Sequence, residues 1–516
     1  MRLDFEDADV IQLEGRELTP SKAVAEDGSH LRTIAREAVA DIEEKFADRL
    51  EINRDLSRSL VSFQANKSEP FYRWFKYREG FSKPLIEYFI DHSNVAGTAN
   101  VLDPFAGTGA TCFVANERGL AATAIELLPV GSNFIRLRQA IFGVEPAEIS
   151  EWLHEIIEDR PWERTNGRIR FSHLRITQDA FGPETDDALA QYRFWVSQQP
   201  QPKKQFCDFL SYSILEDISY TRKDGQYLRW DHRSPRSKIR GNFDKGRIYT
   251  FDEAVISKAQ STLDDLSKGS ADLLSKLNPS QAVSNIALFE GSNFEALEKI
   301  ESASVDLVVT SPPYCNRYDY TRTYALELAY LGCSEEEIRR LRQAQLSCTV
   351  ENRPKDLQGV VSDSAIDKGV AAFEANEAIQ ASIRFLEGEA AAGTLNNAGI
   401  VKMVRGYFTE MAIHIAQLTR IMKPGGRIYM VNDNVRYNGL DLPVDCILSA
   451  FAEELGFRCE KIWVLPMGKG NSSQQMKLHG RSELRKCVYI WELSIGVQTG
   501  PLIGAQKGPP VRMAER

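Results

Sequence analysis

The chain carries short apolar runs that predict the strands of a buried β-sheet. The clearest run occupies residues 305–310 and is followed at once by Ser-Pro-Pro-Tyr. Two consecutive prolines cannot donate ladder hydrogen bonds, so this strand should stop at Thr310. Shorter runs of the same kind predict further strands at residues 101–102, 121–125, 286–289, 427–431, 462–465 and 488–491.

Helical periodicity is clearest at residues 404–422. Apolar residues recur there at intervals of 4, 3, 4, 3 and 4, which is typical of a helix with one buried face. The Lys-Pro-Gly-Gly sequence from Lys423 to Gly426 should end this helix and lead into the next strand. Shorter patterns predict helices at residues 31–50, 110–119 and 444–455.

Strands that alternate with helices predict an α/β fold, but two long stretches interrupt the alternation. The second and third strands should be joined by one helix, whereas residues 127–285 lie between them. That stretch holds helix candidates at residues 149–157, 188–196, 205–218 and 252–277. A second stretch, after Tyr330, is rich in charged residues and alanine and continues to about residue 399.

We therefore expect one α/β domain with two mostly helical insertions. The domain is assembled from three segments of the chain, residues 61–148, 284–332 and 400–493. The insertions occupy residues 149–283 and 333–399. Residues 1–60 should form an N-terminal appendage, and the Gly- and Pro-rich tail at 494–516 should be disordered.

A glycine-rich turn follows the first strand of this domain. Residues 103–109 read Asp-Pro-Phe-Ala-Gly-Thr-Gly, and Gly107 and Gly109 permit a tight turn without a Cβ facing a ligand. The next strand delivers Glu126 to the same edge of the sheet, 17 residues after Gly109. In dinucleotide-binding folds an acidic residue in that place binds ribose hydroxyls. These residues predict a nucleoside site, and a glycine turn in another Rossmann-like sheet is the alternative.

The Ser-Pro-Pro-Tyr sequence should lie at the carboxyl edge of the sheet, where open α/β sheets bind ligands. The Ser311 hydroxyl and the Pro312 carbonyl can accept hydrogen bonds from an exocyclic amine, and the Tyr314 ring can stack on a base. A strand that ends in prolines beside a surface tyrosine is the structural alternative. The functional interpretation requires the glycine turn and the double proline to meet in one cleft.

Taken together, these motifs resemble those of the S-adenosylmethionine-dependent DNA amino-methyltransferases, whose signatures are F-x-G-x-G and [DNS]-P-P-[YFW]. The resemblance covers residues 71–142 and 284–332 well and residues 401–492 loosely. It implies a Rossmann-like mixed sheet with helices on both faces and a C-terminal reversed hairpin. It also implies S-adenosyl-L-methionine as the cofactor and a catalytic set formed by Ser311, Pro312, Pro313 and Tyr314.

The same resemblance implies three groups of cofactor-binding residues. The main group is formed by the turn and the following strand end: Asp103, Pro104, Phe105, Ala106, Gly107, Gly109 and Glu126. Ser82 and Lys83 precede a helix that begins near Pro84, and such an N-terminus can hold the methionine carboxylate. Ser292 and Asn293 stand where related enzymes often carry an acidic residue for the adenine amine.

The proposed reaction is direct methyl transfer to the exocyclic amine of a base flipped out of double-stranded DNA. Ser at the first motif position goes mostly with N4-cytosine in the family and Asp with N6-adenine, so Ser311 favours cytosine and adenine is the alternative. Chemistry at cytosine C5 is not expected because the chain lacks a Pro-Cys motif. An RNA or protein amine methyltransferase and a non-catalytic DNA-binding subunit remain open.

One basic window departs from the overall net charge of −9. Residues 222–247 contain nine basic residues and three aspartates, with aromatic residues between them, as in nucleic-acid surfaces. A solvated charged loop is the alternative. The DNA-binding candidates are Arg222, Lys223, Arg229, Trp230, Arg233, Arg236, Lys238 and Arg240.

The cysteines and the hydropathy pattern indicate the cellular compartment. The eight cysteines include no C-x-x-C pair, so no metal site and no disulfide framework is expected. No apolar run approaches the roughly 20 residues of a membrane span, and the acidic N-terminus lacks a signal core. We expect a cytoplasmic protein whose partner is double-stranded DNA. The resemblance leaves a cognate restriction or defence nuclease open as a second partner.

Overall fold

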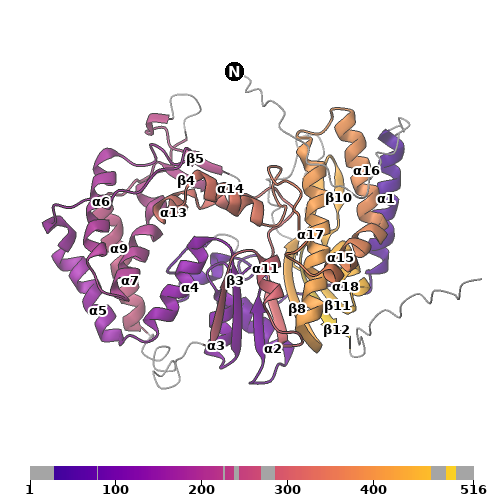
Figure 1. Ribbon diagram of the computed structural model, residues 1–516, viewed down its shortest axis with the longest axis horizontal. Helices are drawn as coiled ribbons and strands as arrows, with labels where there is room; N and C mark the ends of the chain where they lie inside the picture. Colours follow the sequence, from indigo (N-terminus) through magenta and orange to yellow (C-terminus); the bar gives the residue numbers. More distant parts are fainter. Residues whose placement is uncertain are drawn as a thin grey trace, which may run out of the picture.

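A mixed β-sheet of eight strands forms the centre of the computed structural model, which describes residues 28–77, 80–224, 227–236, 243–268, 285–466 and 484–494 (Figure 1). The strand order is β1-β11-β12-β8-β7-β2-β3-β6. The strands, in the order of the sheet, are β1 (Leu50–Ile52), β11 (Phe457–Val464), β12 (Lys486–Leu493), β8 (Met422–Asp433), β7 (Val305–Thr310), β2 (Asn100–Asp103), β3 (Ala121–Glu126) and β6 (Ile286–Glu290).

Strand directions confirm the predicted Rossmann-like sheet. The strands from β6 to β8 run parallel, whereas β12 is antiparallel to both of its neighbours and forms the reversed hairpin with β11. Val101 of β2 pairs with Leu307 of β7, and Leu102 pairs with Val308. The glycine turn and the Ser-Pro-Pro-Tyr sequence therefore leave adjacent parallel strands at the same edge of the sheet.

Side chains of these central strands alternate between two hydrophobic cores. Val101, Leu307 and Val309 belong to one core, and Leu102 and Val308 belong to the other. This alternation is the two-residue period of a strand buried on both faces. The first core is covered by α2 (Lys83–Ser93), α3 (Ala110–Glu117) and α4 (Pro129–Ile141). The second is covered by α11 (Asn293–Glu298), α17 (Gly399–Ile421) and α18 (Val444–Glu454).

Residues 28–60 do not lie apart from the sheet. The helix α1 (Gly28–Lys45) is shorter at its C-terminus than the predicted helix, because residues 50–52 form β1 and pair in parallel with β11. The sequence did not predict β1, because three residues are too few to show the two-residue alternation of a strand. Residues 1–27 and the predicted tail beyond Ser494 lie outside the described residues.

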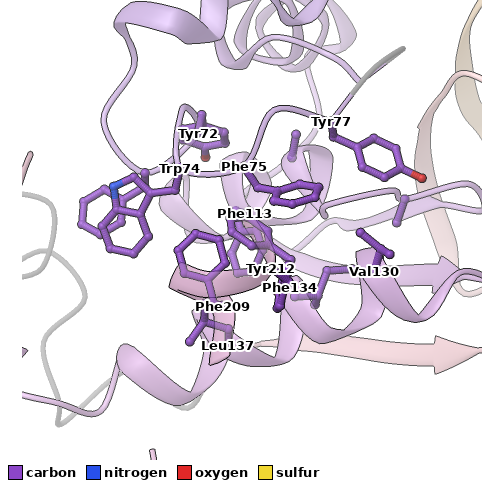
Figure 2. Packing of buried hydrophobic residues seen from close by; sticks show 14 of the residues in the cluster. Tyr72, Trp74, Phe75, Tyr77, Phe113, Val130, Phe134, Leu137, Phe209 and Tyr212 are labelled. Atoms are coloured by element: carbon purple, nitrogen blue, oxygen red, sulfur yellow. The ribbon is translucent and has the colours of Figure 1, made fainter. Parts of the chain in front are cut away.

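The first insertion packs on the α4 side of the sheet. Its helices are α5 (Pro146–His154), α6 (Pro183–Ser197), α7 (Lys203–Ser213), α8 (Leu215–Ile218) and α9 (Phe251–Lys268), with a hairpin formed by β4 (Thr221–Asp224) and β5 (Tyr227–Trp230). Figure 2 shows Phe209 and Tyr212 of α7 among the rings of Phe75 and Phe134. The Phe134 and Phe209 centroids lie 5.3 Å apart, so the insertion shares the first core.

The second insertion packs on both sides of the sheet: Ile338 of its first helix belongs to the first core, and its later helices belong to the second. Its helices are α14 (Glu335–Ala344), α15 (Asp363–Ala375) and α16 (Glu377–Ala391), which follow the short helices α12 (Tyr320–Thr323) and α13 (Ala325–Tyr330). In Figure 1, α16 lies beside α1 and α17, and α14 lies between this group and the first insertion. All eight cysteines are buried and free, and none of the described helices is long and apolar enough to cross a membrane.

Candidate functional site

Asp103, the last residue of β2, joins the two sequence motifs by hydrogen bonds. Its Oδ1 accepts from the Thr310 hydroxyl at 2.9 Å and from the Phe105 N–H at 3.1 Å. Its Oδ2 accepts from the Thr111 hydroxyl at 2.8 Å. Thr310 ends β7 and directly precedes Ser311, so the bond fixes the end of one motif against the start of the other. Burial raises the pKa of Asp103 to about 6.

The two glycines of the turn each have a positive φ and lie against a different side chain of the protein. Gly107 has a φ of 55° and Gly109 a φ of 77°, which other residues rarely adopt. A Cβ on Gly107 would lie 2.8 Å from the ring of Tyr77, whose side chain lines the adjoining cavity. A Cβ on Gly109 would lie 2.8 Å from Cγ1 of Ile135 in α4. Gly109 therefore serves the packing of the protein rather than contact with a ligand.

Glu126 closes the turn from the neighbouring strand. Its Oε2 accepts from the Gly107 N–H at 2.7 Å, and its Oε1 accepts from the Leu128 N–H at 2.8 Å. Burial raises the pKa of Glu126 to about 8. Each carboxylate oxygen can accept more than one hydrogen bond, so the group has capacity left for the hydroxyls of a ligand.

Residues from both motifs line one cavity at the carboxyl edge of the sheet. It encloses about 810 Å³ of empty space, including its open mouth. The sequence predicted that the glycine turn and the double proline share a cleft, and this part of the prediction is confirmed. We call this cavity the cleft; the sequence-predicted residues that line it are Asp103, Pro104, Phe105, Ala106, Gly107, Glu126, Asn293, Ser311 and Pro313.

The remaining predicted residues do not line the cleft: Ser82, Lys83, Gly109, Ser292, Pro312 and Tyr314. Ser82 is fully buried and caps α2 by accepting from the Leu85 N–H, and the Lys83 ammonium lies 2.9 Å from Glu117. Gly80 and Phe81, just before this cap, line the cleft in their place.

The Ser311 hydroxyl lies between two oxygens. It is 3.2 Å from the carbonyl of Val431 in β8 and 3.0 Å from the Tyr314 hydroxyl. A serine hydroxyl has one hydrogen, so donation to the carbonyl leaves its lone pairs free to accept. Tyr314 is only 7 % exposed, and the Lys486 ammonium lies 5.5 Å from its ring centroid. In this arrangement Tyr314 orients Ser311.

Sequence reasoning missed His414, which supports Asn293 from behind the cleft. The Asn293 amide nitrogen lies 3.1 Å from Nδ1 of His414, and the His414 and Phe105 rings are 5.1 Å apart. Burial lowers the pKa of His414 to about 3, so the imidazole is neutral. A histidine within the apolar stripe of α17 was the signal available in the sequence. Gln345, which was not predicted, lines the cleft together with Tyr320.

Much of the basic window is engaged in contacts within the protein. Lys223 is 5 % exposed, and its ammonium donates to Glu327, which is 2 % exposed. A DNA contact by Lys223 would require breaking this buried pair. The Arg233 guanidinium makes two hydrogen bonds to Asp231, at 2.6 and 2.9 Å.

The other candidates of the window surround the β4–β5 hairpin. The Arg236 guanidinium lies 4.9 Å from the Trp230 ring centroid, and that of Arg229 lies 4.0 Å from the ring of Phe243. Arg222, Arg229 and Arg236 are exposed. Lys238 and Arg240 lie outside the described residues.

Comparisons with known proteins place the chain beside two named kinds of enzyme. It is 45% identical over 474 residues to the Type II methyltransferase M.AvaI of Nostoc sp. (strain PCC 7120), and the M.AvaI of Anabaena variabilis gives the same values. Each alignment covers 92% of this chain and 96% of the relative. It is 40% identical over 472 residues to the Type II methyltransferase M.BsoBI of Geobacillus stearothermophilus, covering 87% and 91%. No family model matches the chain. The 92% coverage in the M.AvaI alignment leaves fewer residues over than either insertion contains, so neither insertion lies wholly outside that alignment.

Proposed function

The chain belongs to the type II methyltransferases, and from this premise we propose that it methylates double-stranded DNA at the exocyclic N4 amine of a flipped cytosine, using S-adenosyl-L-methionine. The cleft carries this proposal, because Gly107 and Glu126 on one side and Ser311 and Pro313 on the other line the same space. The bond between Asp103 and Thr310 holds the two sides in register.

The residues of the glycine turn fit the nucleoside part of the cofactor. Glu126 presents a carboxylate with spare accepting capacity for the ribose hydroxyls, and Gly107 leaves room for the Tyr77 ring that lines the cleft beside it. Asn293, held by the neutral His414, offers an amide to the adenine edge. When bound, the cofactor supplies an electrophilic methyl group on its sulfonium. In this proposal Ser82 and Lys83 support the methionine end indirectly, through the loop that ends at Phe81.

The catalytic residues act on the nucleophile. The base amine is a poor nucleophile because its lone pair is delocalised into the ring. Hydrogen bonds from its two N–H groups to the Ser311 hydroxyl and the Pro312 carbonyl would favour a pyramidal nitrogen with a directed lone pair. The part assigned to Pro312 rests on the sequence motif, because of these two residues only Ser311 lines the cleft. Pro313 limits where the base can lie, and positioning of this kind supplies much of the rate. Tyr314 contributes through its hydrogen bond to Ser311, with Tyr320 as a wall of the cleft.

Transfer of label tests the reaction and the base together. The purified protein is incubated with tritiated S-adenosylmethionine and DNA, and the labelled nucleoside is identified. Label in N4-methylcytosine supports the proposal, whereas label in N6-methyladenine replaces cytosine by adenine as the target. Label found only in RNA or protein rejects DNA as the substrate. The Ser311→Ala variant is the matched control, since it should retain cofactor binding while losing transfer.

A non-catalytic DNA-binding subunit would bind DNA without transferring any label. The cleft favours the enzyme over this role because Ser311, Glu126 and Asn293, which the proposal assigns to the base and the cofactor, line one space. Isothermal titration with S-adenosylhomocysteine separates the two functions. A protein that binds DNA but shows no heat of cofactor binding would be the subunit rather than the enzyme.

The exposed arginines of the β4–β5 region form the proposed DNA-contacting surface, with Arg222, Arg229 and Arg236 as its described members. Phosphate contacts make affinity salt dependent, so each lost contact should lower the slope of log K against log salt by about 0.9. The Arg222→Ala variant should show this decrease, and Arg405→Ala on α17 is a control elsewhere on the molecule. An unchanged slope for all three arginines would place the DNA on another face.

The cellular part of the proposal follows from the substrate. Eight buried, free cysteines suit a reducing cytoplasm. A restriction or defence nuclease that reads the same sequence is the expected second partner, because methylation of a base amine would protect that sequence. Digestion of methylated and unmethylated DNA with candidate nucleases tests this pairing directly.

A further inference from the structure

Gln345 brings an unpaired amide to the cleft from the second insertion. The residue follows α14 directly and is only 5 % exposed, yet it lines the cleft. Among the described residues, neither its side-chain oxygen nor its side-chain nitrogen has a hydrogen-bond partner. Leaving a buried polar group unpaired is costly, and such groups are normally satisfied. The amide therefore has unused hydrogen-bonding capacity on a residue that lines the cleft.

The chain around Gln345 is held firmly by charged neighbours. The Ser347 N–H and the Lys355 ammonium both donate to Glu410 of α17, at 2.8 Å. The Gln345 N–H itself donates to the Leu341 carbonyl at 3.1 Å. An amide on a backbone fixed in this way loses little conformational entropy on binding.

The contacts of this segment place Gln345 on the base side of the cleft. Arg342 donates to the buried Asp319 at 2.8 Å, and the Cys348 thiol donates to the Tyr318 carbonyl at 3.3 Å. Asp319 and Tyr318 belong to the loop that continues directly from the Ser-Pro-Pro-Tyr sequence. The cofactor side, by contrast, is formed by β2, β3 and the start of α11.

We propose that Gln345 is a specificity-determining residue that reads the flipped base, an assignment that rests on the proposed function. Ser311 and Pro312 are assigned to the two amine hydrogens, which leaves the adjacent ring nitrogen of the base as an acceptor. The side-chain N–H of Gln345 donates to that nitrogen, N3 in cytosine or N1 in adenine. The second insertion then contributes directly to base recognition in the cleft.

The assignment is tested by removing the acceptor from the base and the donor from the protein, separately and together. The wild-type protein first methylates DNA, and the position of the methyl group is mapped. Duplexes are then made with the target cytosine replaced by 3-deazacytosine, or with 1-deazaadenine if adenine is the target. Loss of a hydrogen bond that leaves a buried partner unpaired should lower kcat/KM about 10- to 100-fold.

The enzyme variants complete the cycle. Gln345→Met keeps the length of the side chain without the amide, and it should lower kcat/KM on the natural base by a similar factor but cause no further loss on the deaza base. Gln343→Met removes an amide from the last turn of α14, where it pairs with the Arg353 backbone, and it should leave the discrimination between the two bases intact. Gln345→Glu loses the donor when ionised, so its activity relative to wild type should recover as pH falls.

Two results would overturn the assignment. Independent, multiplicative losses from Gln345→Met and the deaza base would show that the amide and the ring nitrogen do not meet. A weaker affinity for S-adenosylhomocysteine in Gln345→Met, without coupling to the base, would assign the residue to the cofactor. Methyl transfer by the wild-type protein is established before any variant is compared, so failure of the proposed function would be recognised separately.

Discussion

Gly131 should be one of the least replaceable residues near the cleft, although no sequence motif marks it. It lies in the first turn of α4, where alanine would normally be favoured over glycine by about 0.5–1 kcal/mol. A Cβ at this position would lie 2.3 Å from the Gly107 carbonyl oxygen and 2.8 Å from Cγ of Glu126. The Gly131→Ala change therefore acts on the residues assigned to the cofactor.

The magnitude follows from the size of this overlap. Real Cβ atoms essentially never approach other atoms within 3.0 Å, so the turn or the helix must move by roughly 0.7 Å. Overpacking of this kind costs about 1–3 kcal/mol, which exceeds the gain in helix propensity. We expect a net loss of stability of about 0.5–2 kcal/mol. Because the displaced groups face the cleft, cofactor affinity should also fall about 10-fold or more, which corresponds to at least about 1.4 kcal/mol.

Urea denaturation and calorimetric titration with S-adenosylhomocysteine measure the two effects. Gly388→Ala in α16 is the matched control, since its Cβ would meet only the flexible end of Leu31 at 2.8 Å. That variant should bind the cofactor normally and lose little or no stability. If Gly131→Ala were as stable as wild type and bound the cofactor equally well, the close approach of α4 to the turn would not be the constraint described here.

Three further predictions concern buried polar groups. Thr310→Val removes the donor to Asp103, so it should lower kcat/KM and should also lower the free energy of unfolding, measured in urea, by about 1 kcal/mol. Unchanged kinetics would show that the two motifs do not need this hydrogen bond. The pKa of Glu126 is raised to about 8, so between about pH 4.5 and 8 the folded apo protein keeps a proton that the unfolded chain loses, and this group makes the free energy of unfolding fall as pH rises through that range. Cofactor affinity should rise with pH up to about 8, because the ribose hydroxyls would donate to the ionised carboxylate. A calorimetric affinity that stays flat from pH 6 to 9 would contradict that role. Lys223→Met leaves Glu327 buried and unpaired and should lower the free energy of unfolding by about 3–5 kcal/mol. The Lys223→Met/Glu327→Leu double variant should recover most of this loss in the same denaturation assay. Equal losses in the two variants would argue against a stabilising ion pair.

The sheet and the cleft could be predicted because they depend on local signals. The strand that ends at Thr310 is marked by its own apolar residues and by the prolines that follow. Parallel strands place their carboxyl ends at one edge, so the meeting of Gly107 and Ser311 followed from the order of elements alone. A strand as short as β1 gives no such signal, and its pairing with β11 depends on an element four hundred residues away.

Residues whose role depends on a distant neighbour could not be identified in this way. His414 looks like a polar interruption of a core helix until Asn293 is seen beside its ring. The charge of Lys223 suggested an exposed surface because sequence shows the charge but not its burial. Its partner, Glu327, lies 104 positions further along the chain, beyond the range of any local pattern.

The two insertions therefore do more than surround the sheet. Lys223 of the first insertion lies 4.6 Å from the ring centroid of Tyr324, and that ring stacks at 4.8 Å on Tyr77, which lines the cleft. The second insertion contributes Gln345 to the wall of the same space. Because each insertion supports or forms part of the wall, the cleft cannot be completed by the sheet and its covering helices alone. If Gln345 reads the base as proposed, loosening the second insertion should weaken methyl transfer more than cofactor binding. Loosening the first insertion should weaken cofactor binding as well, because Tyr77 lies against Gly107.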